Sequence, residues 1–385
     1  MSLLVQQPLS LYIHIPWCVE KCPYCDFNSH RLNADMPEAA YVKALIRDLD
    51  DDINRFNLNN RKLHSIFIGG GTPSLFSATA IDSLLSQVFK RFDVSSKEDI
   101  EVTLEANPGT VEADKFIGFA KAGVSRLSIG VQSFESDKLI KLGRIHDNNQ
   151  AIRAAQLAKT CGVKSFNLDL MHGLPNQSIE NALDDLRQAI TLDPDHLSWY
   201  QLTIEPNTAF GSKPPKLPED ETLWEIQEQG VKLLNEAGYR QYEISAYSKP
   251  SVQSRHNLNY WRFGDYLGIG CGAHGKITDS ATGNIYRTVK VKHPKGYLTP
   301  ERCALDHLNA VADTELPFEF MMNQLRLRES FDISRFEQTT GLKANTIVPK
   351  LELASSKGLL ENEGNTWQVS PLGHRYLNDL LEIFL

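Results

Sequence analysis

The chain has 385 residues, of which 41% are hydrophobic and 23% are charged, and its formal net charge is −8. This length exceeds what one hydrophobic core usually holds, so we expect one large domain and at least one smaller unit. The ordinary composition excludes a fibrous or extensively disordered chain, and the acidic balance disfavours nucleic acid as a partner, because a nucleic-acid-binding face is basic.

The patterning of apolar residues excludes two further classes. The segment MSLLVQQPLS has neither the basic leader nor the apolar core of a signal peptide, and no stretch reaches the roughly 18 uninterrupted apolar residues that a membrane span needs. We therefore expect a cytoplasmic protein. In that reducing compartment the six cysteines favour metal or redox use over a disulfide scaffold.

Six short β-rich runs alternate with amphipathic helical stretches along the first half of the chain. The runs begin at Leu11, Ser65, Ile100, Arg126, Ser165 and His196. Strands joined through helices form right-handed parallel crossovers, and a sheet built from such units either stays open or curls toward a barrel. The pattern therefore predicts an α/β fold.

Polar and glycine-rich motifs follow the ends of these runs. Three cysteines come after the first run, GGGTPS comes after the second, and EANP ends the third. Gln132 ends the fourth run, and Asp169 lies in the fifth. Because ligands bind at the carboxyl ends of parallel strands, we expect these motifs to surround one mouth of the fold.

The second half of the chain changes character twice. The stretch PNTAFGSKPPKLP predicts a surface loop, and a β- and loop-rich region follows the next helix. After about Asp313 the pattern becomes helical, with GLLENEGNTWQVS as a hairpin between two helices, which is similar to a winged-helix module without a basic recognition helix. We expect domains over residues 1–240, 241–312 and 313–385.

Cys18, Cys22 and Cys25 lie within eight residues of one another. One interpretation is a zinc site whose fourth ligand is His14 or His30. The other is an iron–sulfur cluster held by three thiolates, which leaves one iron open to the amine and carboxylate of an amino acid. The cysteines alone do not decide between the two sites.

The C-x3-C-x2-C pattern, with Tyr24 before its last cysteine, resembles the signature of the radical S-adenosylmethionine (SAM) superfamily. The resemblance implies a partial (β/α)6 barrel, a 4Fe-4S cluster on the three cysteines, and SAM as a ligand. GGGTPS resembles the motif whose backbone meets the methionyl amine of SAM, here at Gly70, Gly71 and Thr72. Glycines permit this approach because they carry no Cβ.

Five further side chains stand where the coproporphyrinogen-oxidase-like branch of this superfamily holds SAM, namely Tyr12, Glu105, Gln132, Arg144 and Asp169. Arg144 can take the SAM carboxylate bidentately, and the two acids can accept hydrogen bonds from the amine or the ribose hydroxyls. Taken singly, either acid is better interpreted as a strand-end residue that caps the next helix.

Within that branch the resemblance covers nearly the whole chain and is nearest to the heme chaperones. The oxidases of the branch carry an additional cysteine where this chain has Phe27. The HNxxYW motif at His256, Asn257, Tyr260 and Trp261 looks like a heme-binding signature. An imidazole is a normal axial ligand of heme iron, and aromatic rings can cover the macrocycle. From the residues alone, the alternative is a satisfied turn beside core aromatics.

The resemblance implies a heme chaperone that carries a 4Fe-4S cluster, SAM and heme. It also implies apo-hemoproteins as recipients, contact with respiratory hemoproteins at the membrane, and a homodimer. A radical SAM oxidoreductase acting on a porphyrinogen is the alternative, although no residues can be assigned to its substrate propionates. A zinc protein is the third interpretation.

Overall fold

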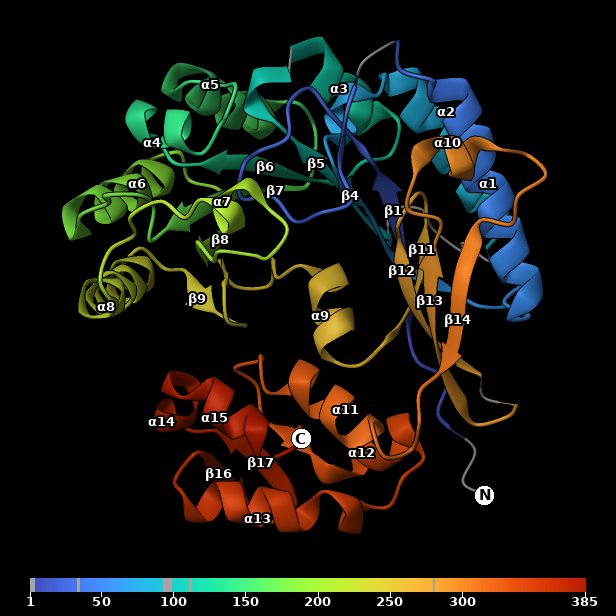
Figure 1. Ribbon diagram of the computed structural model, residues 1–385, viewed down its shortest axis with the longest axis vertical. Helices are drawn as coiled ribbons and strands as arrows, with labels where there is room; N and C mark the ends of the chain where they lie inside the picture. Colours follow the sequence, from blue (N-terminus) through green and yellow to red (C-terminus); the bar gives the residue numbers. More distant parts are fainter. Residues whose placement is uncertain (1–3, 33–34, 93–98, 111–112, 280) are drawn as a thin grey trace.

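A computed structural model gives the structure of residues 4–32, 35–92, 99–110, 113–279 and 281–385. Its main element is a twelve-stranded sheet in the order β14-β13-β12-β11-β1-β4-β5-β6-β7-β8-β10-β9. Figure 1 shows helices along the outer side of this sheet and the C-terminal domain beneath it. The sheet stays open, because β14 and β9 lie at opposite ends of the order. The predicted partial barrel is confirmed.

The six predicted β-rich runs form parallel strands, in the order β1 (Leu9–Ile15), β4 (Leu63–Gly70), β5 (Glu101–Ala106), β6 (Arg126–Gln132), β7 (Ser165–His172) and β8 (His196–Gln201). The helices of this region are α1 (Glu38–Arg55), α2 (Ala78–Phe89), α3 (Ala113–Lys121), α4 (Ser136–Lys141), α5 (Asn148–Thr160), α6 (Ile179–Thr191), α7 (Ala209–Ser212) and α8 (Asp220–Glu236). Asp147 and Ser178 form capping boxes at the starts of α5 and α6, which satisfies backbone amides that a helix leaves free. The predicted alternation of strands and helices is therefore confirmed.

Strands from the region predicted as a β-containing extension continue the same sheet. On one side these are β11 (Asp265–Ile269), β12 (His274–Asp279), β13 (Asn284–Lys290) and β14 (Leu305–Ala310), with α10 (Pro294–Leu298) between the last two. On the other side are β9 (Arg240–Gln241) and β10 (Ala246–Ser248). β11 runs parallel to β1 and pairs Asp265 with Leu9, whereas β12 to β14 pair antiparallel. The domain boundaries proposed from the sequence stay predictions.

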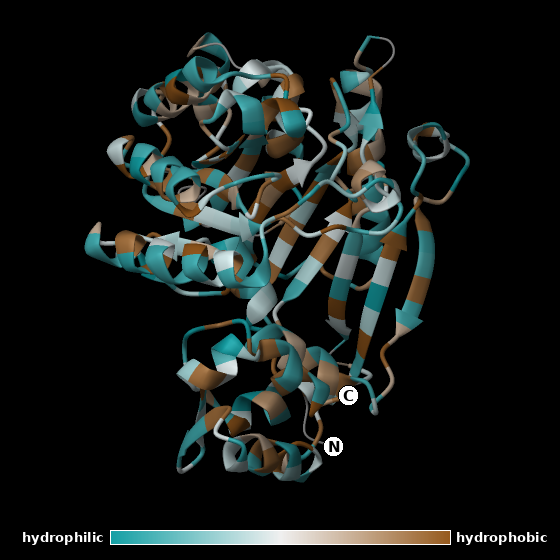
Figure 2. Ribbon diagram, turned by 60° about the vertical axis from the view of Figure 1, so that its left-hand side comes forward, coloured by the Kyte–Doolittle hydropathy of each residue, from teal (hydrophilic) through white to brown (hydrophobic). Residues whose placement is uncertain are grey.

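The main core lies between the parallel strands and the outer helices. Leu11 and Ile13 of β1 and Ile66 and Ile68 of β4 are fully buried. Apolar residues alternate with polar ones along these strands, and Figure 2 shows brown segments alternating with paler and teal ones on the central strands. Packing of this kind holds the carboxyl ends of the strands in fixed positions, and these ends carry the polar motifs.

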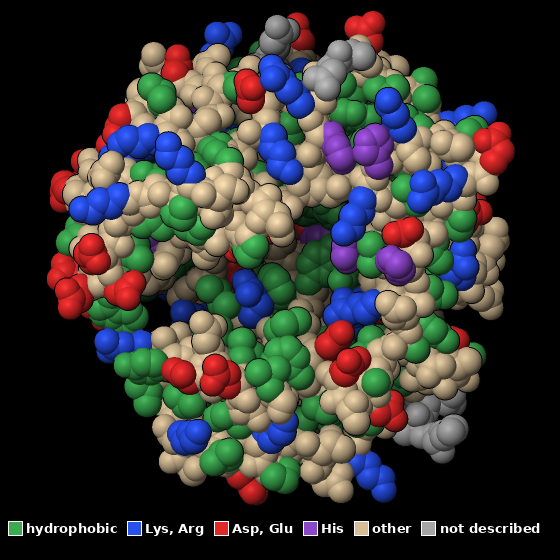
Figure 3. Space-filling model, viewed as in Figure 1, with side chains coloured by type: hydrophobic (Ala, Val, Ile, Leu, Met, Phe, Trp, Pro, Cys, Tyr) green, Lys and Arg blue, Asp and Glu red, His purple; other side chains and the backbone are tan. Residues whose placement is uncertain are grey.

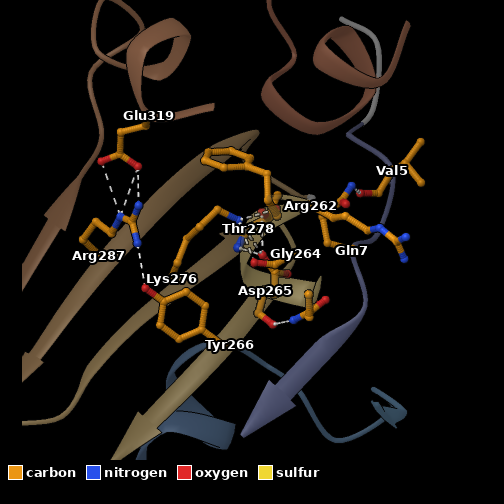
Figure 4. Close-up of polar contacts among 12 residues, drawn as sticks. Val5, Gln7, Arg262, Gly264, Asp265, Tyr266, Lys276, Thr278, Arg287 and Glu319 are labelled. Atoms are coloured by element: carbon orange, nitrogen blue, oxygen red, sulfur yellow. Dashed lines mark hydrogen bonds and ion pairs between the residues drawn. The ribbon is translucent and has the colours of Figure 1, made fainter. Parts of the chain in front are cut away.

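Buried ion pairs join β13 to helix α1 and β12 to β11. Lys290 on β13 contacts Asp48 of α1 at 2.5 Å. Lys276 on β12 contacts Asp265 of β11 at 3.2 Å, and the same carboxylate accepts from the Thr278 hydroxyl at 2.7 Å (Figure 4). A buried charge is costly unless it is paired, so these contacts favour one arrangement of β11, β12 and β13.

The C-terminal domain has a separate core around Phe320 and Phe336. Its helices are α11 (Leu316–Gln324), α12 (Ile333–Thr340), α13 (Val348–Ser356), α14 (Pro371–Arg375) and α15 (Leu377–Glu382). Its sheet has the order β15 (Phe331–Asp332), β17 (Thr366–Val369) and β16 (Leu360–Glu363), so the predicted hairpin is confirmed. Within the described part of the chain, no helix is both long and apolar enough to cross a membrane.

Candidate functional site

The three clustered cysteines line one cavity of about 400 Å³ at the carboxyl ends of the strands, which we call the thiol cavity. Cys18 ends β2 (Trp17–Cys18), which pairs with β3 (His30–Arg31) and so closes the loop that carries Cys22 and Cys25. All three thiols are half-buried. Burial raises the pKa of the Cys18 and Cys25 thiols.

The two histidines considered as zinc ligands make other contacts. Both ring nitrogens of His14 are engaged, one with the Tyr12 hydroxyl at 2.9 Å and one with the Asn28 carbonyl at 2.9 Å. The Nε2 atom of His30 lies 3.3 Å from the Lys292 carbonyl. Among the described residues, no three His, Cys, Asp or Glu side chains are arranged around a single metal ion.

The glycine-rich motif packs directly against the backbone that leads into the cysteine loop. The N–H of Gly71 donates to the Ile15 carbonyl at 2.7 Å, and the N–H of Thr72 donates to the Trp17 carbonyl at 2.7 Å. A Cβ added to Gly71 would lie 2.6 Å from that Trp17 oxygen. Gly70 has φ +112°, a conformation that residues with a side chain rarely adopt. The motif therefore requires glycine in order to meet the cysteine loop.

Arg144 joins the cysteine loop to the end of β6. Its Nη1 lies 3.6 Å from Cys22 Sγ, and its Nη2 donates to the Gly130 carbonyl at 2.7 Å. Its Nε is buried and has no hydrogen-bond partner among the described residues. Gln132 has φ +69° where the pairing of β6 with β7 shifts register. Irregularities of this kind redirect side chains beside active sites.

The half-buried residues Glu105 and Asp169 add two carboxyl groups from β5 and β7. Glu105 accepts from the Gly70 N–H at 3.0 Å, and Asp169 accepts from the Ser128 hydroxyl at 2.9 Å and from the Asn167 amide at 2.8 Å. Burial, followed by the neighbouring Asp169, raises the pKa of the Glu105 carboxyl to about 8. Burial also raises the pKa of Asp169. A cationic ligand group placed here would favour the ionised acids.

Gly70, Gly71, Thr72, Glu105, Gln132, Arg144 and Asp169 all line the thiol cavity together with the cysteines. Sequence reasoning did not single out Asn107, Met171, Tyr200 or Gln201, which line it too. Their location could have identified them, because all four residues lie at or just beyond the ends of β5, β7 and β8.

Tyr12 does not line the thiol cavity. It lines a second cavity of about 720 Å³, which we call the aromatic cavity because Phe67, Tyr260 and Tyr266 also line it. The two cavities share a wall made of Asp26, Phe27, Ser29, Gly70 and Glu105. Figure 3 shows a hollow on this face, with apolar side chains inside it and histidines on its rim.

The HNxxYW motif forms helix α9 (Arg255–Trp261), where sequence reasoning expected strands and loops. Ser254 caps the helix, since its hydroxyl accepts from the backbone N–H of Asn257. His256, Asn257 and Tyr260 line the aromatic cavity. Trp261 turns away from it and stacks under the guanidinium of Arg326, whose carbon lies 4.3 Å from the ring centroid.

His256 is only 1% exposed, and both of its ring nitrogens are engaged. Nδ1 lies 2.9 Å from the Ser65 hydroxyl, and Nε2 lies 2.7 Å from the Tyr260 hydroxyl. Burial lowers the pKa of His256 to about 3, so the ring is neutral. In this arrangement His256 holds α9 against β4 and orients the Tyr260 ring.

Comparison with known proteins agrees with this architecture. Residues 12–189 match the radical SAM superfamily, and residues 311–376 match the HemN C-terminal domain. The chain is 57% identical over 380 residues to the heme chaperone HemW of Haemophilus influenzae, and 56% identical over 378 residues to that of Escherichia coli. Each of these alignments covers 98% of this chain and 98% of the relative. This chain belongs to the HemW family.

Membership of the HemW family confirms the resemblance inferred from the cysteine and HNxxYW motifs. Among solved structures, coproporphyrinogen III oxidase (HemN) from Escherichia coli matches with a TM-score of 0.82 at 24% identity. The match covers 98% of this chain and 90% of that chain. At this identity the likeness shows the fold, including the C-terminal domain.

The residues of the thiol cavity fit the groups that a radical SAM protein carries. Three half-buried thiols face one space, and the Arg144 guanidinium beside Cys22 supplies a positive charge next to what would be a thiolate ligand. The unpartnered Nε of Arg144 leaves a donor for a carboxylate. The donor set therefore suits a cluster with an amino-acid ligand beside it.

Proposed function

We propose that this chain binds heme and delivers it to apo-hemoproteins, and that it carries a 4Fe-4S cluster and SAM. The observation that supports this most is the shared wall of the two cavities, which sets a site rich in thiols and carboxyl groups against one rich in aromatic rings. The relatives in Haemophilus influenzae and Escherichia coli bear the name heme chaperone.

On the thiol side, Cys18, Cys22 and Cys25 would hold the cluster. When bound, the reduced cluster supplies the electron for cleaving SAM. Arg144 would take the SAM carboxylate through its free Nε, while the Gly70 backbone would border the methionyl end. These side chains are half-buried in the cavity, where a charged interaction is stronger than it is in bulk water.

The two acids would meet the donors of SAM. Glu105 and Asp169 lie on one wall with Gln132, and each acid has at least one oxygen within 3.0 Å of a fixed donor. Glu105 accepts a hydrogen bond through one oxygen, and each oxygen of Asp169 accepts one. Carboxylate oxygens have further lone pairs, so an amine or ribose hydroxyl of SAM would donate to either acid, and such donors favour the ionised form.

On the aromatic side, the HNxxYW motif would contribute to the heme site. Tyr260 and Asn257 face the aromatic cavity, and His256 fixes the orientation of Tyr260. Trp261 would act indirectly, because it anchors α9 to the residue Arg326 at the border of the C-terminal domain. Tyr12, which family resemblance assigns to SAM, lines this cavity together with Gly70 and Glu105 of the shared wall.

Phe27 distinguishes this proposal from the porphyrinogen oxidase alternative. It stands where the oxidases carry an additional cysteine, and its side chain is 57% exposed on the shared wall. A large exposed aromatic side chain in a cavity is a typical ligand-contacting residue. A cytoplasmic location stays a prediction from the sequence patterning, and delivery at a membrane surface and a homodimer stay predictions from family resemblance.

Heme transfer tests the proposal. The cluster-loaded chain, charged with heme, is mixed with an apo-hemoprotein, and transfer is followed from the absorption of the recipient. We expect transfer from the loaded chain and no conversion of coproporphyrinogen III when SAM and a reductant are supplied. Turnover of coproporphyrinogen III to protoporphyrinogen IX would contradict the proposal and favour the oxidase alternative.

A further inference from the structure

The aromatic cavity is built on one face of the sheet at the junction of β4, β1, β11 and β12. Successive side chains of a strand point to opposite faces, so Tyr12 and His14 on β1 share a face. Phe67 and Tyr266 line the same cavity from β4 and β11, and His274 lines it from the first residue of β12. The cavity therefore has a wall of rings and one imidazole at its rim.

Four histidines line this cavity, and three of them are engaged through their ring nitrogens. His14 uses both nitrogens, as does His256, and His30 lies 3.3 Å from a backbone carbonyl. The fourth, His274, is exposed, and the described part of the chain contains no hydrogen-bond partner for its ring. Of the four, His274 is the histidine whose two ring nitrogens both lack a partner among the described residues, so an incoming metal can reach either one.

A cation stands beside that imidazole. Lys292 lines the same cavity, and its backbone carbonyl accepts from the Asn28 amide at 2.9 Å and from the Cys271 thiol at 2.7 Å. These contacts fix the backbone from which the ammonium group extends. Burial, followed by the charge of Lys292, lowers the pKa of His274. A neutral imidazole is the form that binds iron.

Imidazole, rings and a cation together match one class of ligand. A planar apolar macrocycle packs on aromatic faces, its iron takes an imidazole, and its carboxylates pair with a cation at the rim. The volume of about 720 Å³ lies within the range of cavities that bury ligands of this size. Phe27, on the shared wall, would separate such a ligand from the thiol cavity.

We propose that heme iron is ligated by His274 and that Lys292 pairs with a heme propionate. This inference rests on the proposed function, because it assigns the ligand within the heme site. It gives His256 a positioning role, since that histidine would orient the Tyr260 ring that packs on the heme.

An anaerobic titration with hemin tests the ligand. The full chain, loaded with its cluster, is compared with His274→Ala and with His307→Ala, which removes an exposed histidine outside the cavity. We expect His274→Ala to weaken binding about ten-fold or more and to shift the Soret band, because removing groups that support a metal already costs about this much. His307→Ala keeps the native spectrum, and added imidazole restores the band of His274→Ala.

Several outcomes would overturn this assignment. A His274→Ala spectrum and affinity equal to those of the unchanged chain would remove His274 as the ligand while leaving heme binding, and thus the proposed function, in place. Absence of saturable binding by the unchanged chain would instead refute the proposed function itself. Since His274 is an exposed strand-end residue, far-ultraviolet circular dichroism is expected to be unchanged in the variant.

The propionate contact has its own test. Lys292→Gln is titrated with hemin and with the dimethyl ester of hemin, which has no carboxylates. We expect Lys292→Gln to weaken hemin binding about ten-fold, as loss of one charge-assisted contact implies, and to leave the affinity for the ester unchanged. Equal weakening for both compounds would show that Lys292 acts through the fold and would overturn this contact.

Discussion

Replacing Gly70 by alanine should disturb both cavities at once, because this residue lies on their shared wall. An added Cβ would lie 2.6 Å from Nδ1 and 2.9 Å from Nε2 of His14. His14 holds the Tyr12 hydroxyl on one side and the Asn28 carbonyl on the other. Pushing this ring aside would therefore disturb the cysteine loop and the aromatic cavity together.

Two effects determine how much stability Gly70→Ala loses. Alanine at a positive φ of +112° costs about 1–2 kcal/mol in the folded state. Overpacking against a buried ring adds about 1–3 kcal/mol. Gly123 separates the two effects, because its φ is +105° but the nearest atom to an added Cβ lies 4.0 Å away. Gly123→Ala carries the backbone strain without the overlap.

Urea unfolding followed by circular dichroism compares the two variants, and SAM binding to the cluster-loaded chain is measured by calorimetry. We expect Gly70→Ala to lower the free energy of unfolding by about 1–3 kcal/mol more than Gly123→Ala does. We also expect only Gly70→Ala to lose SAM binding. Equal destabilisation by both variants, with SAM binding kept in both, would refute the argument that the His14 ring leaves no room for a side chain at position 70.

Two further predictions concern buried charges away from the cavities. Burial raises the pKa of Asp185 to about 7, so between about pH 4 and about pH 7 the folded chain keeps a proton that the unfolded chain releases. The unchanged chain therefore loses stability as the pH rises through this range, and Asp185→Asn does not. The stability of Asp185→Asn relative to the unchanged chain should rise between these pH values, and parallel stability curves would contradict this. Lys290→Met removes the only ion-pair partner that the described residues give the buried Asp48 and leaves Asp52 with Arg55 alone, at 4.0 Å. It should cost about 3–5 kcal/mol in urea unfolding. Lys249→Met, in an exposed pair, should cost at most about 1 kcal/mol, and similar losses for both variants would show that burial of the pair is unimportant.

Local patterns predicted the central strands and the motifs at their ends. The run at Leu11 became β1, and the residues at Gly70, Glu105 and Asp169 came together because parallel strands end at one edge. These features depend on alternation and spacing within short segments. Such information is present in the order of the residues.

The sequence predicts a β-rich region after the barrel, but the pairing of its strands with the central sheet could not be foreseen, because this pairing is non-local. β11 pairs with β1 through residues as far apart as Leu9 and Asp265. Nothing in the sequence near Asp265 marks this partner. The engaged nitrogens of His256 are likewise invisible to sequence reasoning, since Ser65 lies on a strand distant in sequence.

The helical form of the HNxxYW motif was open to sequence reasoning. In a helix, residues four apart share a face, so His256 and Tyr260 lie together while Trp261 points elsewhere. Recognising the motif as helical would have separated Trp261 from the cavity. Tyr12 lines the aromatic cavity together with Gly70 and Glu105 of the shared wall, and its contact with SAM stays a prediction.

The central claim is that one chain holds heme beside its cluster, and the direct measurement is an anaerobic optical titration of the cluster-loaded full chain with hemin. Our account predicts a saturable Soret change at about one heme per chain, with the cluster absorption unchanged, as expected for two cavities that share only a wall. Absence of saturation, or loss of the cluster as heme binds, would contradict it.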